Sequence, residues 1–215
     1  MYVVISTNRP WQVNFAYEQV CRLKEYLKHI KLIVLDNTKE GIDLWGNFAD
    51  YHIHCPECKN VSQMFNHFVE NFTGVYDHLI YTDDDIELSK DFALEVWTHL
   101  TSGYDRVITS KIYVTDLEAD RTGVWYRKES QCGAPWAISA DLFQATCEMT
   151  VKGRQPRFNP DINDGYVQYF RDLPSHNTKY IFSDCCNAIL HGKNTTMKPH
   201  KKMHFEFNME RVRLD

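Results

Sequence analysis

The sequence predicts one α/β domain, built on a mixed, mostly parallel central sheet that is flanked by helices. Three observations lead to this fold class: short apolar segments alternate with segments of helical periodicity, the links between them are short, and polar residues follow the first strands. A length of 215 residues suits a single domain, and 43% hydrophobic with 25% charged residues indicates a globular chain rather than a disordered one. No apolar run approaches the length of a membrane span.

The chain begins with a strand, a helix and a second strand. Residues 2–6 are an apolar strand, apolar residues between Val13 and Ile30 recur at intervals of three and four, and residues 31–35 (KLIVL) form a second apolar run. Short links between such elements make a βαβ unit with parallel strands, and ligands bind at the carboxyl ends of such strands. The polar residues just after these two strands are therefore candidate ligand contacts, although the same residue types are common in turns: Thr7, Arg9, Asp36 and Asn37.

Residues 78–87 (HLIYTDDDIE) run from an apolar strand directly into three carboxylates. Like charges this close repel one another, and a divalent cation such as Mg²⁺ or Mn²⁺, which prefers oxygen ligands, removes that repulsion. In an extended segment residues two apart point the same way, so we expect Asp83 and Asp85 to converge while Asp84 faces elsewhere. A solvated acidic loop is the alternative, and the position directly after an apolar strand favours the metal site.

The remaining elements follow from periodicity and caps. Ser62 and Ser89 precede helical runs as N-caps, Ser139 opens a further helix, and Gly103 marks a helix end. The other expected segments are a loop over residues 41–51, strands over 52–54, 106–114, 124–127, 180–182 and 187–190, a surface loop over 115–123, and a helix over 161–171.

Two later stretches carry residues suited to catalysis and ligand binding. Asp161 and Asp164 stand at the expected start of the helix over residues 161–171, where the helix dipole favours a carboxylate. Capping explains both residues, but an ionised carboxylate there also suits a general base that accepts a proton from an alcohol. His191 follows an apolar strand and precedes Lys193 by two residues, which suits a metal-binding imidazole and a phosphate-binding lysine. A hydrogen-bonded turn is the alternative for His191.

Cysteine content and charge indicate the cellular compartment and the kind of partner. An odd number of cysteines, seven, and an N-terminal MYVVIS that lacks a basic signal-peptide start favour a cytoplasmic protein with free thiols, bacterial or virus-encoded. Cys55 and Cys58 form a CxxC motif that could be half of a zinc site. Cys185 and Cys186 could supply the other two ligands, so a structural zinc site is an alternative. From Thr150 onward Lys and Arg outnumber Asp and Glu by eleven to seven in a chain of net charge −5, so we expect an anionic ligand or acceptor on that side.

Taken in order, these features resemble the GT-A glycosyltransferases, especially their family-2-like inverting group. YTDDDIELSKDF is similar to the DxD segment and the helix after it, CGAPWAISADLF to the small-residue loop and helix at the donor–acceptor junction, and NDGYVQYFR to the acidic catalytic motif. The resemblance implies a GT-A-like, Rossmann-type catalytic domain over residues 1–196, with a nucleotide-binding half over about 1–88 and an acceptor half over about 89–196. A basic tail over residues 197–215 follows.

The resemblance also implies a role for each candidate residue. The implied cofactor is Mn²⁺ or Mg²⁺, and the implied donor is a nucleotide-diphosphate sugar with uridine as its base. Where the family usually has a Glu-Asp pair, this chain has Asn163-Asp164. The implied roles are nucleotide contacts for Thr7, Arg9, Asp36, Asn37 and Asp83, metal ligation for Asp83, Asp85 and His191, charge on the leaving group for Lys193, and general base for Asp164.

The implied reaction is metal-dependent, inverting transfer of a sugar to an acceptor hydroxyl on a glycan or on a hydroxymethylated base in DNA. A sugar-nucleotide nucleotidyltransferase has a related fold, but it normally carries a glycine-rich loop after the first strand, and STNRPWQ has no glycine. A metal-dependent nuclease, a non-catalytic sugar-nucleotide or glycan-binding module and a zinc-stabilised interaction protein are further alternatives.

Overall fold

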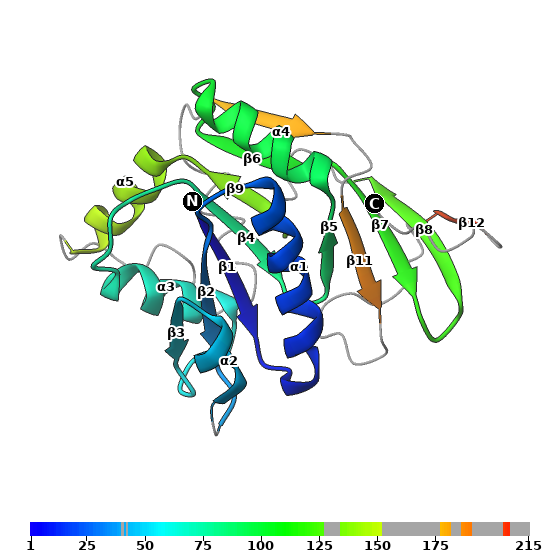
Figure 1. Ribbon diagram of the computed structural model, residues 1–215, viewed down its shortest axis with the longest axis horizontal. Helices are drawn as coiled ribbons and strands as arrows, with labels where there is room; N and C mark the ends of the chain where they lie inside the picture. Colours follow the sequence, from blue (N-terminus) through cyan, green and yellow to red (C-terminus); the bar gives the residue numbers. More distant parts are fainter. Residues whose placement is uncertain are drawn as a thin grey trace.

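The computed structural model describes residues 1–39, 41, 43–126, 134–151, 177–181, 186–190 and 204–206, and these residues form two sheets with flanking helices (Figure 1). The larger sheet has the strand order β10-β6-β9-β4-β1-β2-β3. Its strands are β1 (Tyr2–Thr7), β2 (Lys31–Asp36), β3 (Tyr51–His54), β4 (Leu79–Asp83), β6 (Arg106–Thr109), β9 (Trp136–Ile138) and β10 (Thr178–Ile181). The helices are η1 (Pro10–Gln12), α1 (Val13–Tyr26), α2 (Asp43–Phe48), α3 (Val61–Asn71), α4 (Lys90–Thr101) and α5 (Ala140–Val151).

Strand β1 lies at the centre of the N-terminal half, between β2 and β4, and is parallel to both. The register sets Thr7 opposite Asp36 on one side and Ser6 opposite Asp83 on the other. Only β9 runs antiparallel within the described part of this sheet, between β4 and β6. The predicted mixed, mostly parallel sheet with flanking helices is thus confirmed, and the carboxyl ends of three neighbouring strands meet at one edge.

A second sheet has the order β12-β8-β7-β11-β5. Its strands are β5 (Ile86–Leu88), β7 (Lys111–Asp116), β8 (Arg121–Tyr126), β11 (Cys186–Leu190) and β12 (His204–Glu206). Strand β4 of the first sheet and β5 of the second are separated only by the turn residues Asp84 and Asp85. The acidic turn is therefore the point at which the chain passes from one sheet to the other.

Helix α1 packs beside α4 and also contacts α2, while α3 packs beside α5 (Figure 1). The capping expected at α4 and α5 is confirmed, because the Ser89 hydroxyl accepts a hydrogen bond from the backbone of Phe92 and the Ser139 hydroxyl accepts one from Leu142. Each cap satisfies an N–H group that the first helical turn leaves without a backbone partner. No helix in the part of the chain described here combines the length and apolar character needed to span a membrane.

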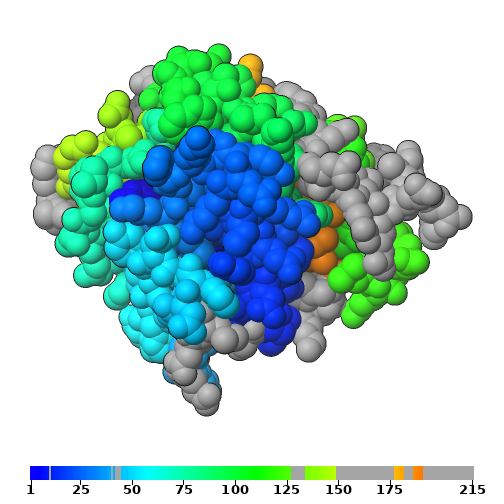
Figure 2. Space-filling model, in the orientation of Figure 1, coloured from blue at the N-terminus to red at the C-terminus, as the bar shows by residue number. Residues whose placement is uncertain are grey.

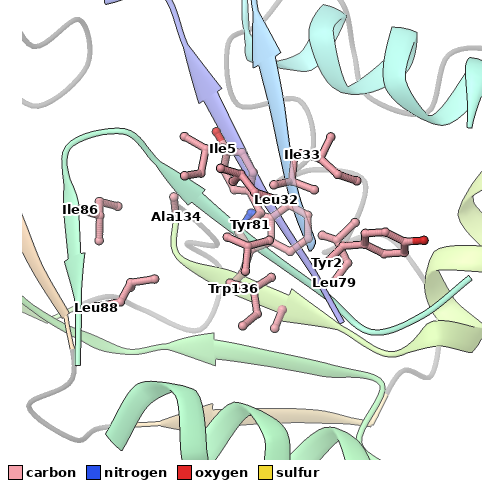
Figure 3. Packing of buried hydrophobic residues seen from close by; sticks show 14 of the residues in the cluster. Tyr2, Ile5, Leu32, Ile33, Leu79, Tyr81, Ile86, Leu88, Ala134 and Trp136 are labelled. Atoms are coloured by element: carbon pink, nitrogen blue, oxygen red, sulfur yellow. The ribbon is translucent and has the colours of Figure 1, made fainter. Parts of the chain in front are cut away.

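The core beneath the sheet is rich in aromatic rings. Figure 3 shows Tyr81 and Trp136 among aliphatic side chains from β1, β2 and β5. Their ring centroids lie 5.2 Å apart, and Phe65 of α3 lies 5.0 Å from the Tyr81 ring. Contacts of this kind add to the burial of large apolar surfaces, so these rings hold α3 against β4 and β9.

Replacing Phe68 with Ala is expected to lower the free energy of unfolding by about 3–5 kcal/mol, because it removes a buried ring and leaves a cavity. Phe68 is 1% exposed, and its ring lies 5.5 Å from that of Phe72 and 5.8 Å from that of Phe143. Urea unfolding measures the loss, with Leu94→Ala on α4, where the side chain is 42% exposed, as the control. Equal losses in the two variants would contradict this assignment of the core.

The structure corrects several expected elements. The single strand expected over residues 106–114 is two strands, because the chain bends at Ser110 and passes from the first sheet to the second. The surface loop expected over 115–123 is largely the β7–β8 hairpin, whose Asp116 carboxylate accepts hydrogen bonds from two backbone N–H groups and pairs with Arg121. Polar residues misled the prediction here, because Thr115, Asp116 and Thr122 are buried in the hairpin and form hydrogen bonds there.

Two further corrections concern helices. The loop expected over residues 41–51 contains α2, which buries Trp45 completely. The N-cap of α3 is Asn60 rather than Ser62, since the Asn60 side chain accepts the hydrogen bond from Gln63. Both are capping residues of similar preference, so sequence alone gives little basis for choosing between them. The helix expected over 161–171 lies outside the described residues.

Candidate active site

The candidate site lies at the carboxyl ends of β1, β2 and β4. The parallel register brings Thr7, Asp36 and Asp83 to the same edge of the sheet. The acidic turn extends this edge toward the second sheet, where the backbone N–H of Ile189 in β11 donates to the carbonyl of Asp85 at 2.9 Å. Figure 2 shows the atoms of β11 in orange between the blue N-terminal region and the green hairpin.

Arg9 binds two of the three carboxylates. Its guanidinium donates to Oδ2 of Asp85 at 2.8 Å and also pairs with Asp84, whose other oxygen accepts a 2.5 Å hydrogen bond from the Thr7 hydroxyl. The Asp84 side chain is fully buried, while those of Arg9 and Asp85 are 12% and 14% exposed. The alternation expected for an extended segment does not hold, because Asp84 and Asp85 form a turn and both face Arg9.

Asp83 has a different set of neighbours. Its Oδ1 accepts a hydrogen bond from the Tyr81 hydroxyl at 2.6 Å, and the Ser6 hydroxyl lies 3.5 Å from the same oxygen. The hydroxyls of Ser6 and Tyr81 are 2.6 Å apart, so the three side chains form one small polar cluster. Among the described residues, the guanidinium of Arg9 contacts Asp84 and Asp85 but not Asp83.

Burial and mutual repulsion raise the pKa values of this cluster. Burial, followed by the charge of Asp85, raises the pKa of Asp83 to about 7. Burial also raises the pKa of Asp84 to about 6, although the guanidinium of Arg9 acts in the opposite direction. Burial lowers the pKa of Arg9, but Asp84 and Asp85 outweigh it and raise that pKa above its ordinary value. Burial is therefore the main cause of both raised carboxyl pKa values, and Arg9 opposes it more strongly at Asp84 than at Asp83.

These residues fit a hard divalent cation in part. Carboxylate oxygens are the ligands that Mn²⁺ and Mg²⁺ prefer, and Asp83, Asp84 and Asp85 supply such oxygens at the end of β4. Within the described residues, however, no three His, Cys, Asp or Glu side chains gather in a metal-binding group. His191 lies outside the described residues. It comes directly after Leu190, the last residue of β11, and Ile189 in the same strand donates the hydrogen bond to the Asp85 carbonyl.

Asp36 supports the loop after β2. Its carboxylate is fully buried, with one oxygen accepting from the backbone N–H (2.8 Å) and hydroxyl (2.7 Å) of Thr38 and the other lying 3.1 Å from Nε2 of His52. Sequence reasoning missed Thr38 and His52, although Asp followed two residues later by Thr is a spacing typical of an Asx turn. The oxygens of Asp36 are thus occupied by the protein itself, which orders the neighbouring Asn37.

Asn37, the next residue, has a side-chain oxygen whose hydrogen-bonding capacity is unused among the described residues. Its side-chain nitrogen donates to the carbonyl of Cys58 at 2.9 Å, and its backbone N–H donates to the carbonyl of Thr7. Its side-chain oxygen is buried and has no hydrogen-bond partner in the described part of the chain. A buried acceptor without a partner costs free energy, so a bound donor group at this position would stabilise the loop.

The CxxC motif forms a tight turn behind this loop. The N–H of Cys58 donates to the carbonyl of Cys55 at 3.0 Å, and both free thiols are buried. Burial raises the pKa of each thiol above its ordinary value. Cys186 is buried in β11 of the other sheet. The described cysteines form no metal-binding group, and Cys185 lies outside the described residues.

Three predicted site residues lie outside the described residues: Asp164, His191 and Lys193. The structure does bring together Thr7, Arg9, Asp84 and Asp85 in one hydrogen-bonded cluster. The sequence alone assigned no role to Asp84. Its contact with Thr7 could not be predicted from the acidic segment, because Thr7 lies 77 residues away in the chain.

No protein-family model matches the chain, and no curated protein matches its sequence. Solved structures match in fold. Residues 1–349 of TarS from Staphylococcus aureus align with a TM-score of 0.60 at 9% identity, over 87% of this chain, which spans 60% of that one. The 4-diphosphocytidyl-2C-methyl-D-erythritol synthase of Anaerococcus prevotii aligns with a TM-score of 0.52 at 13% identity, over 84% of this chain and 86% of the other.

A protein from Bacillus anthracis described as a glucose-1-phosphate thymidylyltransferase aligns with a TM-score of 0.50 at 10% identity, over 86% of this chain and 87% of its own. At these identities the similarity concerns the fold alone. The chain therefore shares with these proteins a mixed α/β, GT-A-like fold, and the central sheet formed by its described residues has seven strands.

Proposed function

We propose that this chain is a metal-dependent transferase acting on nucleotide-diphosphate sugars, and specifically a glycosyltransferase that uses a UDP-sugar. The observation that carries the proposal is the acidic turn at the end of β4, beside the ends of β1 and β2 and at the junction of the two sheets. Crevices at the carboxyl ends of parallel strands bind nucleotides in open α/β sheets, and clustered carboxylates there suit a cation that holds a diphosphate.

The proposed binding roles divide along the edge of the sheet. Asn37, directly after β2, contacts the nucleotide base, and Asp36 keeps that loop in place. Asp83, Asp85 and His191 would hold Mn²⁺ or Mg²⁺, which supplies positive charge to the departing diphosphate when bound. Thr7 and Arg9 face the same edge from the end of β1.

Two residues known from the sequence alone complete the proposal. Asp164 accepts the proton of the acceptor hydroxyl as that oxygen attacks the anomeric carbon, and Lys193 adds positive charge near the leaving group. Asp161 is expected to cap the same helix and take no part in the reaction. The acceptor is a glycan or a hydroxymethylated base in DNA, and the excess of basic residues after residue 150 favours an anionic acceptor.

A nucleotidyltransferase is the second candidate. It is favoured by the alignments with the 4-diphosphocytidyl-2C-methyl-D-erythritol synthase and with the thymidylyltransferase, which cover 86% and 87% of those two chains. Such an enzyme would cradle phosphates with free backbone N–H groups after the first strand. Here the N–H of Arg9 already donates to the Thr7 hydroxyl at 3.1 Å, and Pro10 has no N–H to offer. This loop chemistry ranks the glycosyltransferase first.

Two assays with the same protein separate these functions. With Mn²⁺, a UDP-sugar and candidate acceptors, a glycosyltransferase releases UDP, and Asp164→Asn is expected to lose that activity while Asp161→Asn keeps it. With a nucleoside triphosphate and a sugar 1-phosphate, a nucleotidyltransferase releases pyrophosphate instead. Pyrophosphate without UDP release would replace the first proposal with the second. Binding of nucleotide without either product would indicate a non-catalytic binding module.

A further inference from the structure

The turn from Cys55 to Cys58 holds two free thiols that the proposed function does not use. Its two ends are joined by the hydrogen bond from the N–H of Cys58 to the carbonyl of Cys55 at 3.0 Å, and Pro56 and Glu57 are the turn residues between them. The Cα atoms at the two ends of such a turn lie less than about 7 Å apart. A disulfide usually spans Cα atoms about 4.4–6.8 Å apart, so the backbone of this turn suits a disulfide between its ends.

The two thiols differ in exposure, which sets the order in which they react. Cys55 is 0% exposed and Cys58 is 8% exposed. Burial is the largest influence on the pKa of both thiols and raises both values, whereas a hydrogen bond with Cys55 acts to lower the pKa of Cys58. Because the thiolate is the reactive form, the greater exposure of Cys58 and its hydrogen bond with Cys55 make Cys58 the thiol that attacks first.

Both ends of the turn are bound to the carboxyl end of β2. The N–H of Cys55 donates to the carbonyl of Asp36 at 2.8 Å, and the side-chain nitrogen of Asn37 donates to the carbonyl of Cys58 at 2.9 Å. Asp36 is the last residue of β2, and Asn37 follows it directly. A change in how firmly the turn is closed therefore acts directly on these two residues.

We propose that Cys55 and Cys58 are a redox-active dithiol, which a small-molecule disulfide oxidises to a Cys55–Cys58 disulfide that holds the turn closed in the folded protein. The Cys58 thiolate attacks one sulfur of the small disulfide, breaks its S–S bond and releases one thiolate. The Cys55 sulfur then attacks the Cys58 sulfur and releases the second thiolate. Two electrons pass to the small disulfide, and the two protons of the protein thiols end on the two released thiols. Closure needs neither metal nor nucleotide, so this inference stands apart from the proposed function.

The test treats the folded wild type with excess oxidised glutathione, unfolds it in acid and labels the remaining thiols with iodoacetamide. Trypsin then releases residues 40–59 as one peptide, in which Cys55 and Cys58 are the two cysteines. We expect the untreated peptide to carry two labels, and the oxidised peptide to carry none and to be lighter by two hydrogens. Dithiothreitol should restore both labels. If the peptide keeps two labels under conditions that close it in urea-unfolded protein, the inference is wrong.

Two single variants test the order of attack. In Cys55→Ser, the thiol of Cys58 remains and has no second thiol in the turn to close on, so the peptide should accumulate a mixed disulfide with glutathione. In Cys58→Ser, the fully buried Cys55 should stay unmodified over the same time. Glutathione on Cys55 rather than on Cys58 would contradict the proposed order, and the wild-type experiment still decides the inference if either variant fails to fold.

Hydrogen exchange tests whether the disulfide holds the turn closed. Opening of the turn breaks the hydrogen bond that the Cys58 N–H donates to Cys55, and a disulfide between the ends opposes that opening. By the loop-closure entropy of a four-residue loop, we expect exchange of the Cys58 amide to slow about tenfold on oxidation. The Leu27 amide, which donates to the carbonyl of Leu23 at the end of α1, should exchange equally in both forms. Unchanged or faster exchange at Cys58, measured by nuclear magnetic resonance, would overturn the claim that the disulfide holds the turn closed.

Discussion

Replacing Asp85 with Asn is expected to lower the turnover of a UDP-sugar by about 10³-fold, because a bound metal supplies several kcal/mol of charge stabilisation to a leaving diphosphate. The substitution keeps the size of the side chain and leaves the buried Asp84 paired with Arg9, so the loop after β1 should keep its place. Steady-state release of UDP at saturating Mn²⁺ measures the change.

Glu87→Gln is the matched control for this prediction. Glu87 lies two residues further along, in β5, where it pairs with Arg22 at 2.9 Å and accepts a hydrogen bond from Asn187. The pair with Arg22 is partly exposed and worth about 1 kcal/mol or less. Turnover should therefore stay close to that of wild type. Equal losses in the two variants, or full activity of Asp85→Asn, would contradict the assignment of Asp85 as the principal metal ligand.

Replacing Asp83 with Asn is expected to stabilise the metal-free protein at pH 8 and to have little effect at pH 4. The folded pKa of Asp83, about 7, lies above the ordinary value of 3.8, so folding favours the protonated carboxyl. Below pH 3.8 the protonated Asp83 carboxyl makes its full contribution to the free energy of unfolding. That contribution is lost as the pH rises through 7 and the carboxyl ionises in the folded protein. At about 1.4 kcal/mol per pKa unit, and with allowance for partial exposure of the residue, the gain at pH 8 is about 2–4 kcal/mol.

Urea unfolding at pH 4 and at pH 8, with a chelator present, measures this difference. Asn can still accept the hydrogen bond that Tyr81 donates to Asp83. Asp91→Asn, in the exposed first turn of α4, removes an equal charge from the surface and should change stability by less than about 1 kcal/mol at either pH. A gain from Asp83→Asn that is the same at both pH values would contradict the raised pKa.

The N-terminal half of the fold could be predicted because its signals are local. The periodicity of α1 and the apolar runs of β1, β2 and β4 are complete within short segments, and a βαβ unit has few topologies open to it. Long-range choices were less visible. The change of sheet at Ser110 follows from pairing with strands far away in the chain, since β6 pairs with β10 in the first sheet and β7 pairs with β11 in the second.

The candidate site shows the same division between local and distant information. The acidic turn was visible as charge after an apolar strand, but its geometry depends on Arg9, which lies about 75 residues earlier in the chain. Asp36 was expected to meet the nucleotide, and its burial under Thr38 and His52 could not be read from a short polar segment. Among the described residues, those contacts leave Asn37, rather than Asp36, with a buried side-chain oxygen that has no hydrogen-bond partner.

Calorimetry of nucleotide diphosphates with and without Mn²⁺, on wild type and on Asp85→Ala, is the sharpest test of a metal-dependent nucleotide site. We expect that one nucleotide binds, that its affinity depends on Mn²⁺, and that Asp85→Ala abolishes this dependence. Absence of binding by every nucleotide, or binding that Mn²⁺ and Asp85→Ala leave unchanged, would contradict a metal-dependent nucleotide site at the acidic turn.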